Sequence, residues 1–255
     1  MLPSRAVMLL GLVVAPGCLS GSYNEAHTKS VARYREAGDF QRLHREPKPL
    51  AGGRLSVRVP KLFTKENTDK PTLLDDLPGF CCTLQELIDT GNGGEKMPVN
   101  LTIWAPVDDA AGLEDVKKRI SDTIKAQKDP AFADASWGNV DVPQARPSAW
   151  AVMSLQGQQP FERLAAGEQG VRETKSTEGT TKIWVAADPE RKVCTVLMWR
   201  VPQEAVATVP LEVLAPLVVR TVEMKAVEPP AAAAAPAAAV APPPAAAAPP
   251  APPAQ

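Results

Sequence analysis

The amino-acid sequence predicts an α+β domain in which a mostly antiparallel sheet carries helices on its faces. Three observations predict this fold class: short runs with strand-like alternation, one amphipathic helical stripe, and a late pair of β-rich runs joined by a short turn. The elements follow one another as strands, helix, strands, hairpin and helix, an order that favours an α+β arrangement. Roughly 200 residues remain between two unusual terminal segments, which is enough for one domain.

The first half of the domain is expected to begin with strands. Residues 55–59 alternate apolar and polar side chains before Pro60 closes the run, a pattern typical of a half-buried strand. Residues 80–84 and 99–104 are further strand candidates. The glycine-rich segment 91–94 between them is expected to form a turn.

An amphipathic helix is expected after Pro106. Four apolar residues recur at helical spacing and form a single stripe, namely Leu113, Val116, Ile120 and Ile124. Asp108 and Asp109 precede this stripe. Aspartates are favoured at helix N-termini as caps and as partners of the helix dipole, so these two residues are expected to cap the helix.

A β-hairpin and a last helix are expected near the end of the domain. Residues 180–187 and 192–200 are rich in Val, Ile, Thr and Trp, and the four residues between them suit a short turn. The second run has little polar surface, so it is expected to be a central strand covered on both faces. The last helix is expected at residues 211–222, after Pro210 and with Pro216 as a kink.

The N-terminus predicts export. Residues 1–17 are expected to be a signal peptide, because Arg5 precedes an apolar run that is much shorter than the roughly 20 residues of a transmembrane helix. Ala15, Gly17 and Cys18 resemble the lipobox of bacterial lipoproteins, in which the cysteine is lipidated and becomes the mature N-terminus. Ordinary signal-peptidase cleavage at the small residues near position 17 is the alternative interpretation.

The lipoprotein resemblance implies a location and an anchor. It implies that Cys18 holds the protein to membrane lipid in the bacterial envelope, facing the periplasm or the cell exterior. Residues 18–50 are expected to form a polar helical linker, and residues 22–66 carry a net charge of +5. Basic segments near a membrane are attracted to anionic lipid. A solvated helix face is the alternative explanation for this charge.

The C-terminal segment 227–255 is expected to remain outside the folded domain, which then comprises residues 51–226. From position 229 onward the chain contains only Pro and Ala apart from Val240 and Gln255, with ten prolines in 27 residues. Prolines remove amide donors and fix φ, so an extended and unpacked segment is expected. It is either an arm that reaches a partner or a tolerated low-complexity extension.

The order of elements carries a second resemblance. The opening strand at 55–60, the helix after Pro106, the hairpin around Pro189 and the closing helix from Leu211 resemble the PsbP-like α/β/α sandwich found in small secreted lipoproteins. The resemblance covers residues 55–224. It implies a non-enzymatic accessory that binds or assembles other proteins, here a protein of the envelope.

Catalytic patterns are sparse. The sequence has no Gly-rich phosphate loop, no nucleophile elbow and no C-x-x-C motif. His27 and His44 both lie in the linker and are expected to face solvent, so no metal ion or other cofactor is expected in the domain. No basic stripe with interleaved aromatic residues points to nucleic acid. The alternative function is a hydrolase that attacks envelope polymers through carboxylates such as Asp108 or Asp141.

Cysteine and tryptophan give the remaining candidate residues. Neighbouring residues on a strand face opposite ways, so Cys81 or Cys82 is a candidate to pair with Cys194, and buried free thiols are the alternative. Zinc is not expected, because three sulfurs have no nearby histidine. Trp137 stands in a loop-like stretch and is the candidate for an exposed binding aromatic, whereas the other four tryptophans are expected to pack in the core.

Overall fold

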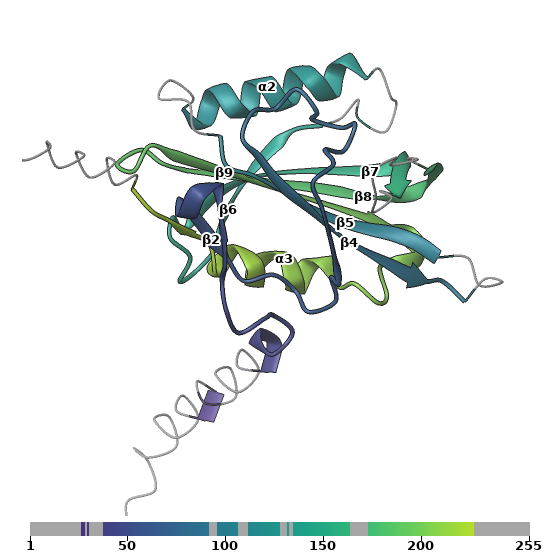
Figure 1. The fold of residues 1–255 in the computed structure, drawn as a ribbon, viewed down its shortest axis with the longest axis horizontal. Helices are drawn as coiled ribbons and strands as arrows, with labels where there is room; N and C mark the ends of the chain where they lie inside the picture. Colours follow the sequence, from purple (N-terminus) through teal and green to yellow (C-terminus); the bar gives the residue numbers. More distant parts are fainter. Residues whose placement is uncertain are drawn as a thin grey trace, which may run out of the picture.

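A seven-stranded antiparallel sheet forms the middle layer of the domain, and one long helix covers each of its faces (Figure 1). This computed structural model describes residues 27–28, 30, 38–91, 96–106, 112–127, 132, 135–163 and 173–226. The α+β fold class expected from the sequence is therefore confirmed. Among these residues, no helix is long and apolar enough to cross a membrane.

The strands of the large sheet lie in the order β3-β4-β5-β9-β8-β7-β6, and each neighbouring pair is antiparallel. Their bounds are Lys65–Asn67 for β3, Phe80–Asp89 for β4, Lys96–Trp104 for β5, Trp137–Asp141 for β6, Ala149–Arg163 for β7, Glu173–Asp188 for β8 and Val193–Pro202 for β9. The β8–β9 pair is the expected hairpin. All ten residues of β9 are buried, so this strand is central and covered on both faces, as its composition predicted.

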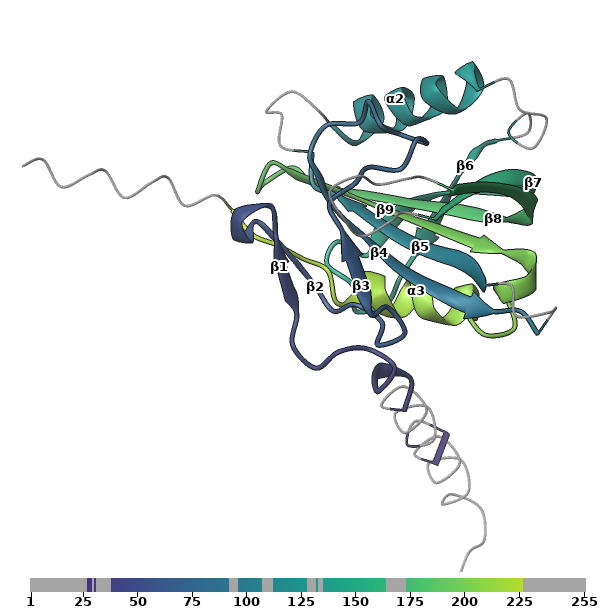
Figure 2. The ribbon, with the colours of Figure 1, turned by 45° about the vertical axis from the view of Figure 1, so that its right-hand side comes forward.

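A small second sheet lies beside the large one (Figure 2). It contains β1 (Lys48–Leu50), β2 (Leu55–Val57) and β10 (Glu223–Met224) in the order β1-β2-β10. The turn η1 (Ala51–Gly53) joins the first two strands. The Lys48 ammonium contacts the carboxylate of Glu66 on β3, which ties the small sheet to the edge of the large one.

Two helices cover the large sheet. α2 (Leu113–Ala126) buries Val116, Ile120 and Ile124, as the apolar stripe predicted. The expected cap is wrong: Gly112 is the N-cap residue, and the acidic residues of the first turn belong to the helix itself. Asp108 and Asp109 lie outside the described residues. α3 (Leu211–Arg220) forms after Pro210, with the short helix η3 (Gln203–Ala205) just before it.

Each face of the sheet has its own apolar core. On the α3 side, Leu101 and Trp199 of the sheet pack with Leu214 and Val218 of the helix. On the α2 side, residues such as Met198 pack with the helix stripe. Burial of apolar area on both faces is the main stabilising contribution to a three-layer fold of this kind.

The packed region begins before the expected domain boundary at residue 51. Leu43 is completely buried and forms an isolated bridge with Pro60, and Leu50 of β1 also belongs to the α3-side core. The linker pattern did not reveal this, because single leucines in a polar stretch give no periodic signal. His27 and His44 are exposed, as expected.

Candidate functional site

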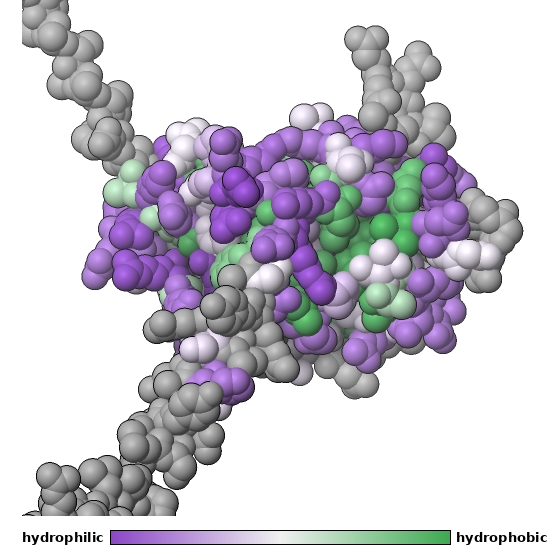
Figure 3. All heavy atoms as spheres, turned by 90° about the horizontal axis from the view of Figure 1, so that it is seen from below, coloured by the Kyte–Doolittle hydropathy of each residue, from purple (hydrophilic) through white to green (hydrophobic). Residues whose placement is uncertain are grey.

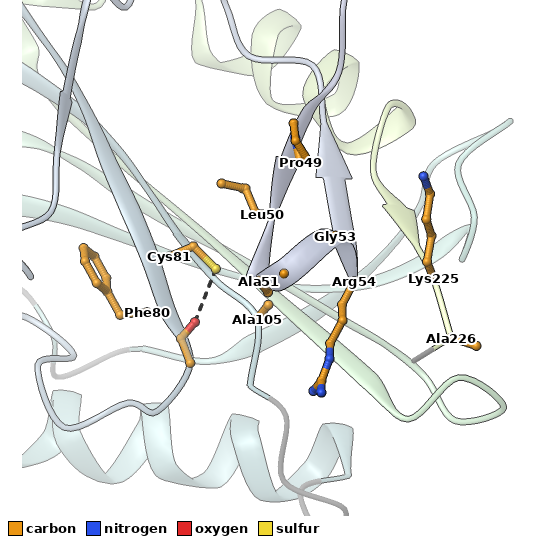
Figure 4. Close-up of a pocket in the computed structure, with 12 residues that line it drawn as sticks. Pro49, Leu50, Ala51, Gly53, Arg54, Phe80, Cys81, Ala105, Lys225 and Ala226 are labelled. Atoms are coloured by element: carbon orange, nitrogen blue, oxygen red, sulfur yellow. Dashed lines mark hydrogen bonds between the residues drawn. The ribbon is translucent and has the colours of Figure 1, made fainter. Parts of the chain in front are cut away.

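A pocket of about 1190 Å³ opens where the small sheet meets the large one; it is called the end pocket below (Figure 4). Four short segments line it: residues 49–54 of β1, η1 and the start of β2, residues 79–81 at the start of β4, Ala105 after β5, and residues 225–226 after β10. The pocket therefore depends on segments that are up to 177 residues apart in the sequence.

A left-handed turn shapes one side of the end pocket. Ala51, Gly52 and Gly53 have φ values of 50°, 65° and 87°. L-residues with side chains adopt this region at a cost, so two consecutive glycines favour the turn. Nothing lies within 4 Å of where a Cβ atom would stand on either glycine, so the pocket is open at this turn.

A β-bulge shapes the other side. Phe80 pairs with Trp104 and Cys82 pairs with Ile103, which leaves Cys81 as the extra residue on β4. Gly79 precedes the bulge with a φ of 76°, and its carbonyl accepts a 2.7 Å bond from the Ala105 amide. A Cβ on Gly79 would lie 2.5 Å from the Ala105 carbonyl oxygen, so no other residue fits this close approach.

The bulge turns the Cys81 thiol into the end pocket, where it donates a hydrogen bond to the Gly79 carbonyl at 3.5 Å (Figure 4). Burial raises the pKa of Cys81, while the nearby backbone amides of Ala105 and Ala51 act in the opposite direction. The thiol is therefore protonated at neutral pH and is a packing group with access to the pocket.

Positive charge lines the end pocket. Arg54 and Lys225 both line it, and the Lys225 amide donates a 2.7 Å hydrogen bond to the Arg54 carbonyl, so the two residues are adjacent. Figure 4 shows their side chains pointing in opposite directions from this junction, on the side away from Phe80 and Leu50. Neither cation forms an ion pair with a carboxylate in the described part of the chain, and no described lining residue is acidic.

The three cysteines of the domain are free thiols. The bulge places Cys81 and Cys82 together on the α3 side, whereas Cys194 belongs to the core on the α2 side. The expected alternation of neighbouring cysteines is therefore wrong at this position, and the candidate disulfide to Cys194 is not formed. Burial raises the pKa of Cys82 and of Cys194 to about 12.

A second concentration of polar groups is fully enclosed; it is called the buried polar cluster below. It lies on the α2 side of the sheet and contains Thr83, Gln85, Asn100, Thr102, Gln159, Glu162, Thr181 and Arg200, all of them buried. Gln85 donates to the Asn100 side-chain oxygen at 2.8 Å, and both amide groups also donate to the Glu162 carbonyl at 3.2 and 3.1 Å. Sequence reasoning missed this cluster, because its members are far apart in the chain.

The two charged side chains of the buried polar cluster have partners, although the Nε atom of Arg200 has no hydrogen-bond partner among the described residues. The Glu162 carboxylate accepts a 3.0 Å hydrogen bond from the Thr72 amide. The Arg200 guanidinium donates to the Pro160 carbonyl and lies 5.3 Å from the centre of the Phe161 ring. Desolvation lowers the pKa of Arg200 to about 10, against the opposing effect of Glu162, so the guanidinium remains charged at neutral pH.

The surface beside α3 is a further candidate. Figure 3 shows hydrophobic side chains gathered between hydrophilic ones on the face seen from below. Val206, just after η3, and Val213 on α3 are exposed large hydrophobic residues, at 37% and 39%. Single exposed valines are ordinary on folded proteins and indicate no particular ligand. The end pocket, with two cations at an apolar surface, is the stronger candidate.

The residues singled out from the sequence do not converge on one site. Trp137 is half-buried and lies on β6 rather than in a loop, where its Nε1 donates to Ser121 at 2.9 Å. The other four tryptophans are buried, as expected. Asp141 is exposed at the end of β6, and Cys18 and Asp108 lie outside the described residues. Those described residues contain no group of three or more metal-ligating side chains.

Comparisons with known proteins leave the function to be argued from the chain itself. No family model matches the chain, and no curated protein matches it. Among solved structures, it is similar to the Ran-binding protein Mog1p of Saccharomyces cerevisiae, with 12% identity and a TM-score of 0.37 over 71% of this chain and 96% of that one. An immunity protein of the Stenotrophomonas maltophilia type IV secretion system matches with 13% identity and a TM-score of 0.28 over 71% and 95%. TM-scores below 0.5 transfer neither a site nor an activity.

Proposed function

We propose that the chain is an exported bacterial lipoprotein, held to a membrane through Cys18, whose domain binds a partner protein at the end pocket. The observation that carries the binding role is the chemistry of that pocket. Apolar residues and backbone form one side, and two cations without carboxylate partners in the described chain lie on the other. Charged groups that the fold leaves unpaired beside apolar surface are typical of recognition sites.

The same chemistry favours binding over hydrolysis. Glycoside hydrolysis uses two carboxylates about 5–10 Å apart, and general acid–base catalysis needs a titratable group near the substrate. The described lining of the end pocket offers two basic side chains and a thiol with a raised pKa, without an acidic residue or a histidine. Asp141, one of the carboxylates considered for a hydrolase, lies on an edge strand away from this pocket.

Site-specific photo-crosslinking in the native host tests the binding role. A photoreactive phenylalanine analogue at Pro49 lines the end pocket, and the same group at the exposed Val140 of β6 is the matched control. We expect one defined cross-linked partner from position 49, absent from position 140, and lost when Arg54→Glu reverses a pocket charge. The same adducts at both positions, or adducts unaffected by Arg54→Glu, would contradict the proposal.

Membrane fractionation of a Cys18→Ser variant tests the anchor. The lipobox resemblance predicts that the lipid is attached to this thiol. We expect the variant to leave the membrane fraction, while Cys81→Ser, the control, stays with it. A Cys18→Ser protein that still fractionates with membranes after signal cleavage would place the anchor elsewhere.

A further inference from the structure

The end pocket has two chemically different walls, and this difference specifies a ligand pattern. The apolar wall consists of Leu50, whose side chain belongs to the α3-side core, and Phe80, which packs against the α2-side core. Figure 4 shows Arg54 and Lys225 on the other side of the pocket. The volume of about 1190 Å³ exceeds the roughly 300–1,000 Å³ of sites for small molecules. A pocket of this size that is open at the Gly52–Gly53 turn suits a segment of polypeptide.

An extended peptide presents successive side chains to opposite sides with a period of two residues. A strand that runs between an apolar wall and a cationic wall therefore places every second side chain on each. Arg54 and Lys225 diverge from adjacent backbone positions, so their charges are spread along the cationic wall rather than focused on one point. Two carboxylates separated along the peptide match this spread better than a single one.

We infer that the end pocket binds an extended segment of a partner protein in which acidic side chains alternate with apolar ones. This inference rests on the proposed function, because it names the chemistry of the partner at the same site. The acidic side chains pair with Arg54 and Lys225, and Arg54 can hold a carboxylate through two parallel N–H···O bonds. The apolar side chains cover Leu50 and Phe80.

The chain's own C-terminal segment fits this pattern poorly, although it begins beside the pocket. Ala226 lines the end pocket, and the next residues lead into the Ala/Pro segment. That segment contains one acidic side chain, Glu228, and ten prolines, which lack the amide donors of an ordinary strand. Charge complementarity thus favours an acidic segment from another protein.

Titration with synthetic peptides tests the inference directly. The probe is the N-acetylated, C-amidated hexapeptide Glu-Val-Glu-Val-Glu-Val, added to the mature protein and followed by backbone amide NMR and calorimetry. We expect saturable shifts at the amides of residues 50–54 and 80–81, and at least tenfold weaker binding for the neutral Gln-Val analogue. A block peptide of the same composition, Glu-Glu-Glu-Val-Val-Val, is expected to bind several-fold more weakly.

Substitutions in the protein locate the interaction. Arg54→Met and Lys225→Met are each expected to weaken binding of the Glu-Val peptide several-fold. Raising the salt concentration is expected to weaken binding to the parent protein as well. Lys118→Met, on the exposed face of α2, is the matched control and should leave the affinity unchanged. Circular dichroism of each variant confirms that the fold persists.

Several results would overturn the inference. Equal binding of the Glu-Val and Gln-Val peptides, equal binding of the block peptide, or the absence of binding would each do so. Displacement of the Glu-Val peptide by a synthetic peptide of residues 229–255 would assign the pocket to the chain's own tail instead. A partner cross-linked from position 49, together with a negative peptide titration, would leave the proposed function standing and remove only the acidic-apolar pattern.

Discussion

The buried polar cluster and the end pocket differ in where their polar groups find partners. In the cluster, Gln85, Asn100 and Glu162 bond to one another or to the backbone and are buried. In the pocket, Arg54 and Lys225 lie at an open apolar surface without a carboxylate partner in the described chain. Polar groups satisfied inside the chain specify the fold, whereas unpaired groups at a cavity are available to a ligand.

The largest expected effect comes from breaking the cluster. Asn100→Leu removes the acceptor for one N–H of the buried Gln85 amide and one of the two donors to the Glu162 carbonyl, which leaves that Gln85 N–H without a partner. We expect a loss of about 2–3 kcal/mol in the free energy of unfolding, measured by urea denaturation. Asn139→Leu on the exposed strand β6 is the control, with a change within about 0.5 kcal/mol. Equal losses in the two variants would show that the cluster has no special role.

Thiol reactivity gives a second comparison between buried and pocket groups. Burial raises the pKa of all three thiols, to about 12 for Cys82 and Cys194, so those two are almost fully protonated at pH 8. Because Cys81 lines the pocket whereas the other two are buried, iodoacetamide should modify Cys81 first, and faster as the pH rises. Mass spectrometry of the native protein measures the order in which the three cysteines are modified. In urea-unfolded protein the three should react at similar rates. Native Cys194 that reacts as fast as Cys81 would contradict its placement in the core.

The smallest expected effect concerns the C-terminal segment. A chain that ends at Ala226 should keep the melting temperature of the full mature protein. Residues 227–255 contain no large apolar side chain other than two valines, and ordering each residue costs about 1–2 kcal/mol. Differential scanning calorimetry of the two proteins makes the comparison. A fall of several degrees on truncation would mean that the segment docks on the domain.

Local patterns predicted the elements whose signals lie within one stretch of chain. The stripe from Leu113 to Ile124 predicted α2, and the apolar run of β9 predicted a central strand. The part of the β7–β8 pair formed by residues 156–163 and 173–179 was not predicted, because these residues are largely polar. Their strand conformation depends on pairing with each other, which the sequence does not reveal; Gln159, for example, accepts a hydrogen bond from Thr181.

The end pocket could not be predicted for the same reason. Its lining comes from four separate segments, and its shape depends on the bulge at Cys81 and on the close approach of Gly79 to Ala105. Paired glycines at 52–53 are a turn signal in any sequence, and nothing local joins them to Lys225. The prediction that Cys81 and Cys82 face opposite sides of the sheet was wrong, because a bulge interrupts the alternation of side chains on which it depended.

The measurement that tests the account most directly is the stability of the Arg54→Met, Lys225→Met double variant beside its affinity for the Glu-Val peptide. If the two cations serve a ligand rather than the fold, urea denaturation should give a free energy of unfolding within about 0.5 kcal/mol of the parent protein. Peptide binding by the same sample should fall at least tenfold. A double variant that loses stability but still binds the peptide would contradict the division between the buried polar cluster and the end pocket.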